Sequence, residues 1–517
     1  MALASLLLVT ACASKRIRRD NAAALIMADA RVLEGCHDCL VDARAIYERL
    51  AGSKYTNRDT ISLRLFETNL MLVVREKELA LDWNASTERA KALASRVPSS
   101  ADASRLLKIV DAVLPDATGR PNDWPTEMRR ERRDFVPTIP GEIAWLATAP
   151  LRPVVRDYLA LALDCSYDAK VLAPNRQRGS AQRRPVLPPD SPPVITYRTG
   201  ICMTAEPAML AAVLALVPRF HEAAYFAGTF AAFGAEEDGG QRASPLLGEA
   251  HEHFPKAPGV NFMRGWLAKT IGECSEAVRH FDETLVIDAA HEYALLERTI
   301  CLSRLHQDTA AIASATRLLD LHTESAQPAY YWRAVSLLRL KDLPAARSDI
   351  EAAKALARDA NALTLGGMIE NEQNDLPIAE RDLREARALL HGEENCTAAW
   401  TLALVIGKGN RPAEAAQTFG AAMGCYDNKV SDIGYMIGKL REKPSSNPAY
   451  LARRIAAYES DSTDQRTRYF ASAFNAAGHT ANAGQLAKAL ELLDVAARDA
   501  KLAAPVAELR KAIAAIR

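Results

Sequence analysis

The feature that most constrains the fold is a spaced pattern of small residues between Pro258 and Cys425. Its first position holds a small side chain at intervals of 34, 35, 33 and 36 residues, at Gly265, Thr299, Ala334, Gly367 and Ala403. Twelve residues after each of them comes an alanine, at Ala277, Ala311, Ala346, Ala379 and Ala415. Two helices can approach closely only where both present small side chains. The pattern therefore predicts five helical hairpins in one register.

Two further positions of the second helix, mostly apolar, and the turn residues keep the same register. Four residues beyond the alanines stand Phe281, Ala315, Ile350, Leu383 and Phe419, and three further on stand Thr284, Leu318, Ala353, Ala386 and Ala422. Turn signals fall between the two helices, at Gly272-Glu273, Gln307-Asp308, Lys341-Asp342, Asn374-Asp375 and Gly409-Asn410. Repeat length, small residues and turns together resemble the tetratricopeptide repeat. The resemblance implies an all-α solenoid whose first helices line a concave, partner-binding face.

The rest of the chain is expected to extend this solenoid. A chain of 517 residues exceeds what one hydrophobic core normally supports, and the composition favours helix. Proline clusters near the middle predict irregular connections, because proline lacks a backbone donor and disfavours helix in the preceding residue. We expect a leader with a lipidated cysteine at 1–12, degenerate hairpins at 13–114, a Pro-rich, loop-containing junction at 115–204, a degenerate hairpin at 205–257, five repeats at 258–426, and degenerate hairpins with a capping helix at 427–517.

The N-terminus carries a short apolar run from Ala2 to Val9, followed by Thr10-Ala11-Cys12. This arrangement resembles the lipobox of bacterial lipoproteins, and the run is too short to span a bilayer. The resemblance implies cleavage before Cys12, a lipid on its sulfur, and, because Ala13 and not Asp follows, an outer-membrane anchor. The expected location is the bacterial envelope, facing the periplasm or the cell surface.

Without Cys12, eight of the nine cysteines remain, an even number that suits a disulfide-permissive compartment. Three pairs are candidates for disulfides: Cys36 with Cys39, Cys165 with Cys202, and Cys396 with Cys425. The last pair is expected at the open end of one hairpin, where the two helices are neighbours.

The spacing of Cys36 and Cys39 leaves other interpretations open, namely free thiols, a redox pair or half of a zinc site. Cys274 and Cys301 fall on core-facing helical positions and are expected to be buried thiols.

No motif predicts catalysis. The chain lacks a Gly-rich phosphate loop, a nucleophile elbow and a His-Glu-x-x-His sequence. In His251-Glu252-His253 the two imidazoles point about 200° apart on a helix, so they form no simple chelate. Basic and acidic residues balance at 64 each, so no global field attracts nucleic acid. We expect no enzyme, no cofactor, no metal and no nucleic-acid partner.

The resemblance also implies which residues meet a partner, since the concave face belongs to the first helices. The matching positions are Phe262, Trp266, Lys269, Tyr293, Arg304, Tyr331, Arg339, Asn371, Trp400 and Lys408. Aromatic side chains beside Arg and Lys are typical of peptide-binding surfaces.

The expected function is a non-enzymatic scaffold that is exported, lipid-anchored at Cys12, and binds a protein or peptide along its concave face. Two alternatives remain open at this stage. One is an envelope factor that binds peptidoglycan or another glycan, and the other is a cytosolic adaptor whose Cys12 carries no lipid.

Overall fold

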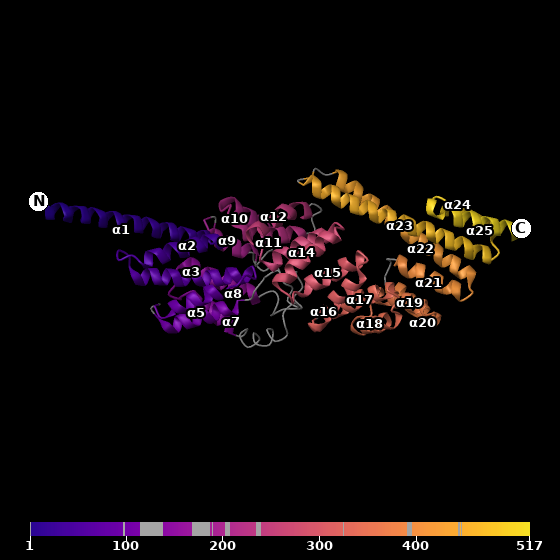
Figure 1. Ribbon diagram of the computed structural model, residues 1–517, viewed down its shortest axis with the longest axis horizontal. Coiled ribbons are helices and arrows are strands. Elements are labelled where there is room, and N and C mark those ends of the chain that lie inside the picture. The colour runs from indigo at the N-terminus through magenta and orange to yellow at the C-terminus, as the bar shows by residue number, and fades with distance from the viewer. Residues whose placement is uncertain are drawn as a thin grey trace. The chain divides into compact units, whose positions relative to one another are not determined.

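The computed structural model describes residues 2–96, 99–113, 138–167, 187–188, 190–201, 207–233, 239–323, 325–389, 395–442, 445 and 447–516. Throughout these ranges the regular structure is helical, with no strand, so the predicted all-α class is confirmed (Figure 1). The chain divides into two compact units. Unit 1 comprises Met1–Arg264 and Val286–Asp288, and unit 2 comprises Gly265–Leu285 and Ala289–Arg517.

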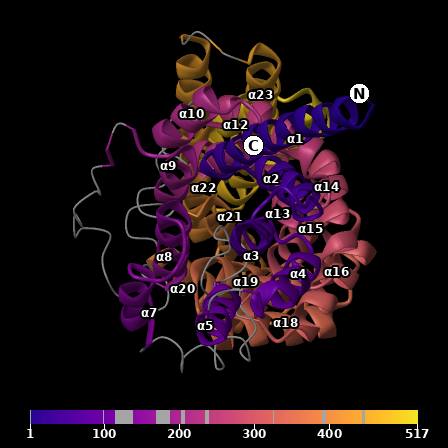
Figure 2. The ribbon, with the colours of Figure 1, turned by 90° about the vertical axis from the view of Figure 1, so that its left-hand side faces the viewer.

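Unit 1 is a bundle of helices around α3, whose residues are buried from Leu65 to its end. The α3 helix contacts α2, α4, α5 and α8, and Figure 2 shows these helices around it. The helices of unit 1 are α1 (Ala2–Glu34), α2 (His37–Ala51), α3 (Arg58–Glu78), α4 (Asn84–Ala94), α5 (Ser100–Ala112), α7 (Ile139–Leu146), α8 (Pro153–Tyr167), α9 (Pro193–Thr199), α10 (Pro207–Leu216), α11 (His221–Phe233) and α12 (Gly239–His253).

The segment 115–204, expected to be a loop-containing junction, includes the three helices α7, α8 and α9. Leu146, Tyr158 and Val194 from these helices are buried in the core of unit 1. Each helix has a proline in its first turn, where the missing backbone donor costs nothing. These prolines therefore begin helices within the Pro-rich segment. Residues 114–137 and 168–186 lie outside the described part of the chain.

The five predicted hairpins are present in the order that the small residues indicate. The first helices are α13 (Pro258–Thr270), α15 (Glu292–Arg304), α17 (Ala326–Arg339), α19 (Ala360–Glu372) and α21 (Cys396–Lys408). The second helices are α14 (Cys274–Ile287), α16 (Asp308–Asp320), α18 (Leu343–Leu356), α20 (Leu376–Leu389) and α22 (Pro412–Glu442).

The small residues lie where each first helix crosses its second helix. The alanine of every second helix is fully buried, from Ala277 to Ala415. A Cβ built on Gly265 would lie 2.6 Å from the Phe281 ring, and one on Gly367 would lie 2.5 Å from Leu383 Cγ. The helices thus approach more closely at these two positions than an alanine would allow.

Each first helix ends in a repeated left-handed turn. The residue with positive φ is Gly272, His306, Lys341, Asn374 or Asn410. The next residue's N–H then donates back to a carbonyl five residues earlier, as from Glu273 to Ala268 O at 3.0 Å. This bond satisfies a carbonyl at the end of the helix and fixes the reversal of the chain. Side chains at positive φ are uncommon, so only part of this turn could be predicted from glycine and asparagine.

The C-terminal region contains the two longest helices of unit 2. Segment 427–517 was expected to form degenerate hairpins with a capping helix; in the structure α22 continues to Glu442 and packs along α23 (Pro448–Asn482). Gly434 and Gly438 lie inside α22, so these glycines do not end it. Asn447 caps α23 by accepting from Tyr450 N at 3.1 Å. The shorter α24 (Leu486–Ala496) and α25 (Ala503–Ile516) follow, and Gly484 makes the expected turn.

The long hairpin of α22 and α23 returns to the first repeat (Figure 1). Arg453 Nε of α23 lies 3.4 Å from Glu273 Oε1 in the turn between α13 and α14. A Cβ on Gly272 would lie 3.3 Å from Ala457 Cβ. The hairpin therefore connects the last repeat with the first.

Two of the three candidate disulfides fall on described residues, and the structure forms both. Cys36 pairs with Cys39 and Cys396 pairs with Cys425, with Cα atoms 4.9 Å and 5.4 Å apart. The side chain of Cys165 and all of Cys202 lie outside the described residues, as does the side chain of Cys12.

Among the described residues, none of the helices has both the length and the apolar character needed to cross a membrane.

Substituting alanine at two glycines should separate close packing from helix propensity. In Gly367→Ala, the clash with buried Leu383 costs about 1 to 3 kcal/mol, which outweighs the propensity gain of about 1 kcal/mol. Gly434→Ala meets open space on α22 and should gain stability. Thermal unfolding followed by circular dichroism should show a lower midpoint for the first variant and a higher one for the second. Equal shifts would contradict the close approach at Gly367.

Candidate functional site

The candidate site is the surface formed by the first helices of the repeats, called here the first-helix face. Consecutive first helices α15, α17, α19 and α21 are in contact, whereas the described second helices of neighbouring repeats are spaced more widely. In a curved stack the more closely spaced helices lie on the inner side. This face is therefore the concave surface of the repeat stack.

Three of the predicted cations on this face hold neighbouring repeats together. Lys269 Nζ lies 2.5 Å from Glu297 Oε2, and Lys408 Nζ donates to the Asn371 carbonyl at 3.1 Å. Arg339 Nε donates to Asp308 Oδ1 at 2.8 Å. All three cations lie in the last turn of a first helix, where positive charge is favoured by the helix dipole. The carboxylates partly neutralise the charges of Lys269 and Arg339, whereas Lys408 is hydrogen-bonded to an uncharged backbone carbonyl.

The fourth predicted cation, Arg304, is exposed and lies beside two buried thiols. A hydrogen bond with Cys301 and the positive charge of Arg304 lower the pKa of the Cys274 thiol to about 7. The same hydrogen bond, together with burial, raises the pKa of Cys301. The two cysteines are buried thiols, as expected.

The aromatic residues on the predicted positions are half-buried, so each contributes to packing and leaves part of its surface accessible. This group contains Phe262, Trp266, Tyr293, Tyr331 and Trp400.

Two of these rings illustrate how the aromatic side chains are packed. The Trp400 ring meets Phe419 of its own repeat edge-on, with centroids 5.3 Å apart. Burial raises the pKa of Tyr331. The remaining predicted residue, Asn371, is buried, and its side-chain oxygen has no hydrogen-bond partner among the described residues.

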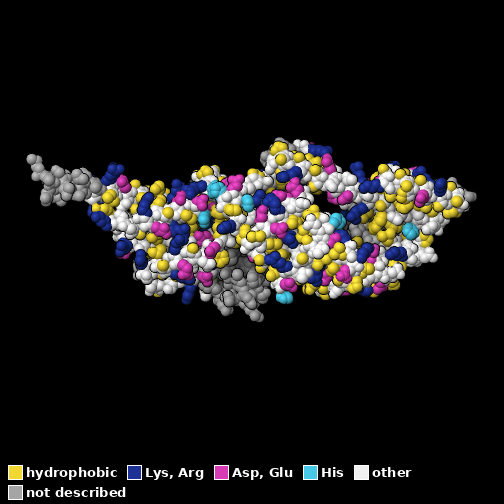
Figure 3. All heavy atoms as spheres, viewed as in Figure 1, with side chains coloured by type: hydrophobic (Ala, Val, Ile, Leu, Met, Phe, Trp, Pro, Cys, Tyr) yellow, Lys and Arg dark blue, Asp and Glu magenta, His cyan; other side chains and the backbone are white. Residues whose placement is uncertain are grey.

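The charge of the surface is mixed. Figure 3 shows basic and acidic side chains interspersed over the visible face, with no extended region of one sign. This agrees with the balanced composition of the sequence.

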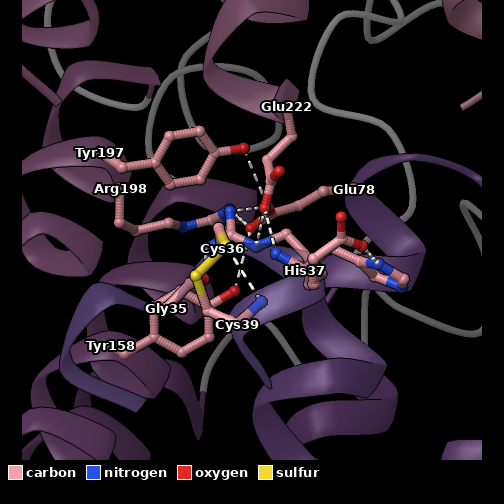
Figure 4. A network of polar contacts seen from close by, with 11 residues as sticks. Gly35, Cys36, His37, Cys39, Glu78, Tyr158, Tyr197, Arg198 and Glu222 are labelled. Atoms are coloured by element: carbon pink, nitrogen blue, oxygen red, sulfur yellow. Dashed lines mark hydrogen bonds and ion pairs between the residues drawn. A yellow bond between two sulfur atoms is a disulfide. The ribbon is translucent and has the colours of Figure 1, made fainter. Parts of the chain in front are cut away.

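A second polar cluster, in unit 1, was not found by sequence analysis (Figure 4). Its centre is Arg75 of α3, whose side chain is fully buried. Arg75 Nη1 lies 2.7 Å from Glu78 Oε2, Nε lies 3.3 Å from Glu222 Oε1, and Nη2 donates to the Gly35 carbonyl at 2.8 Å. Arg198 forms a second ion pair with Glu78.

Aromatic rings complete the surroundings of Arg75. Its guanidinium lies 4.1 Å from the Tyr197 ring centroid and 5.5 Å from that of Tyr158. The Tyr197 hydroxyl donates to Glu78 Oε2 at 3.2 Å. Burial lowers the pKa of Arg75, but the negative charges around it, Glu78 first, outweigh this effect and the net pKa is raised. Burial raises the pKa of Glu222, and Arg75 opposes that increase.

The Cys36–Cys39 disulfide lies directly beside this cluster, at the start of α2. Both cysteines are fully buried, and Cys36 Sγ accepts from Cys39 N at 3.0 Å as a helix cap. The backbone N–H of His37, the residue after Cys36, donates to Glu222 Oε1 at 2.6 Å. A redox pair requires an accessible sulfur, so the geometry favours a structural disulfide over the redox alternative.

Removing Arg75 should destabilise unit 1 strongly. Arg75→Met leaves the carboxylates of Glu78 and Glu222 buried with fewer partners, which we expect to cost about 3 to 5 kcal/mol. Arg89→Met, the same substitution at an exposed site of α4, should change stability by less than about 0.5 kcal/mol. Urea unfolding monitored by circular dichroism measures both. Similar midpoints for the two variants would show that the cluster contributes little.

Residues 203–374 match the family model described as Iml2/Tetratricopeptide repeat protein 39. No curated protein matches the chain significantly.

Similar solved structures include MamA, residue 41 to the end, from Desulfovibrio magneticus RS-1, at 22% sequence identity and a TM-score of 0.30, covering 33% of this chain and 96% of that solved chain. A tetratricopeptide repeat protein from Parabacteroides merdae ATCC 43184 is 13% identical with a TM-score of 0.36, covering 51% of this chain and 93% of its own.

The repeated register of small residues, the left-handed turn that ends each first helix and the family match over residues 203–374 agree with one another. They identify the repeats of this chain as tetratricopeptide-type repeats.

Proposed function

We propose that this protein is a non-enzymatic scaffold that binds an extended protein or peptide segment along the first-helix face. The observation that carries the proposal is the contact between consecutive first helices, which makes one continuous concave surface across several repeats. Packed helices lie about 8 to 10 Å apart, and an extended chain rises about 3.3 Å per residue. A bound peptide would thus pass about three residues over each first helix.

The side chains on this face suggest the chemistry of the partner. Arg304 is exposed and can pair with a carboxylate. The unpaired side-chain oxygen of Asn371 can accept a backbone N–H once a partner or a small rotation gives access to it. The half-buried aromatic rings supply apolar contact area. A peptide with acidic and apolar side chains fits this combination.

Export and lipid anchoring are further parts of the proposal. They rest on the lipobox-like sequence that ends at Cys12. The two disulfides support them, because disulfides persist in oxidising compartments such as the periplasm. On this view the protein presents its repeats on one side of the bacterial outer membrane.

Charge reversal on the first-helix face should weaken peptide binding. The probe is an array of extended peptides that differ in acidic content, read with the purified full-length protein. Arg304→Glu should reduce binding of acidic peptides about 10-fold or more, since one charge-assisted hydrogen bond to a carboxylate contributes about 1.5 to 3 kcal/mol. The control is Arg317→Glu, at an exposed site on the second helix of the same repeat.

Unchanged binding by Arg304→Glu, with helix content equal to that of the parent, would contradict the peptide proposal. Capture of isolated peptidoglycan by the parent protein, without peptide binding, would favour the glycan alternative instead.

Metabolic labelling with a lipid analogue tests the anchor. The parent chain should incorporate the label and fractionate with membranes, whereas Cys12→Ala should lose the label. Equal labelling of the two chains, or none in the parent, would argue against lipidation at Cys12.

A further inference from the structure

Three potential metal ligands from distant parts of the sequence meet in unit 1. Asp38 lies in the first turn of α2, His221 begins α11 and His253 ends α12. One ligand atom from each residue lies within 4.8 Å of the other two. Asp38 and His221 are half-buried and His253 is exposed, so an ion and its water can reach the cluster.

A carboxylate orients the first of the two imidazoles. Glu249 Oε1 lies 3.0 Å from Nδ1 of His221. This contact fixes the proton on Nδ1 and leaves Nε2 with its lone pair available. Metal-binding histidines commonly hold their other nitrogen in such a contact with a carboxylate.

Asp38 is held as an anion beside them. A hydrogen bond with His37 lowers the pKa of the Asp38 carboxyl, with a smaller contribution from the charge of Arg219. His37 Nδ1 lies 3.3 Å from Asp38 Oδ1. Arg219 is itself paired with Asp42 at 2.9 Å, which limits its repulsion of a cation.

The two histidine rings are stacked, with centroids 3.3 Å apart and planes inclined by 4°. The nitrogen lone pairs of parallel rings lie in parallel planes, so one ring must turn before both imidazoles can face the same ion. His253 is exposed, so its ring has room to turn.

We propose that Asp38, His221 and His253 form a zinc site, with water as the fourth ligand. Two imidazole nitrogens and one carboxylate are a ligand set that suits Zn²⁺ better than Mg²⁺ or Ca²⁺, which prefer oxygen ligands alone. The ion connects the start of α2 with both helices of the α11–α12 hairpin. The three ligands belong to unit 1, whereas the first helices α15, α17, α19 and α21 belong to unit 2, and the site does not depend on the proposed peptide binding.

Titration of the untagged, full-length, chelator-treated protein with Zn²⁺ tests the site. We expect one saturable ion per chain and a higher thermal midpoint when zinc is present. Co²⁺ should give the visible absorption of a four-coordinate site. His253→Asn and His221→Asn should each weaken Zn²⁺ binding by at least about 100-fold, and Glu249→Gln by about 10- to 100-fold.

The matched control is His322→Asn, at an exposed position of unit 2 with positive φ that asparagine tolerates. It should bind Zn²⁺ as the parent does. Because His253 is exposed, His253→Asn should have the same thermal midpoint as the parent when both are free of metal. This variant therefore decides the test even if His221→Asn fails to fold. The proposal is overturned if the parent binds no stoichiometric zinc, or if His253→Asn binds it as tightly as the parent.

Discussion

The close crossing of the two helices in each hairpin is the contact on which the repeat architecture depends. At Gly265 and Gly367 the missing Cβ lets the first helix approach a large residue of the second helix. The left-handed turn after each first helix then brings the second helix back in the same register. Because these two local features recur at nearly constant spacing, each repeat meets its neighbour in a similar way, and a continuous first-helix face results.

This face serves both stability and the proposed binding. Lys269, Arg339 and Lys408 lie at positions that the family resemblance assigns to a partner, yet each contacts a neighbouring repeat. A cation at the end of a first helix is favoured by the helix dipole and can reach a neighbouring repeat. The charges of Lys269 and Arg339, which are paired with carboxylates, are then less available to a ligand. Arg304 and Lys408 are the exposed members of the four predicted cations and are therefore the best placed for recognition.

Sequence reasoning succeeded where structure is determined by local spacing. The small residues of the repeats, the turns at Gly272 and Asn374, and the pairing of Cys396 with Cys425 all follow from short-range pattern. It is less informative where a residue has two possible roles. A proline can interrupt a helix or begin one, as in α7, α8 and α9, and a glycine can follow the end of a helix, as Gly272 does, or lie inside one, as Gly434 does in α22.

The clusters of unit 1 could not be found in this way, because their members are brought together only by the folded chain. Arg75 meets Glu222, and His253 meets Asp38 and His221, across long stretches of sequence. Considering His251 and His253 on one helix alone excludes a chelate, since their imidazoles point apart. That comparison does not include the ligands on other helices, and two of these, Asp38 and His221, lie near His253. Long-range polar contacts of this kind are costly to bury without partners, so their convergence around the start of α2 indicates that this segment, and not only the repeats, is held in a defined position.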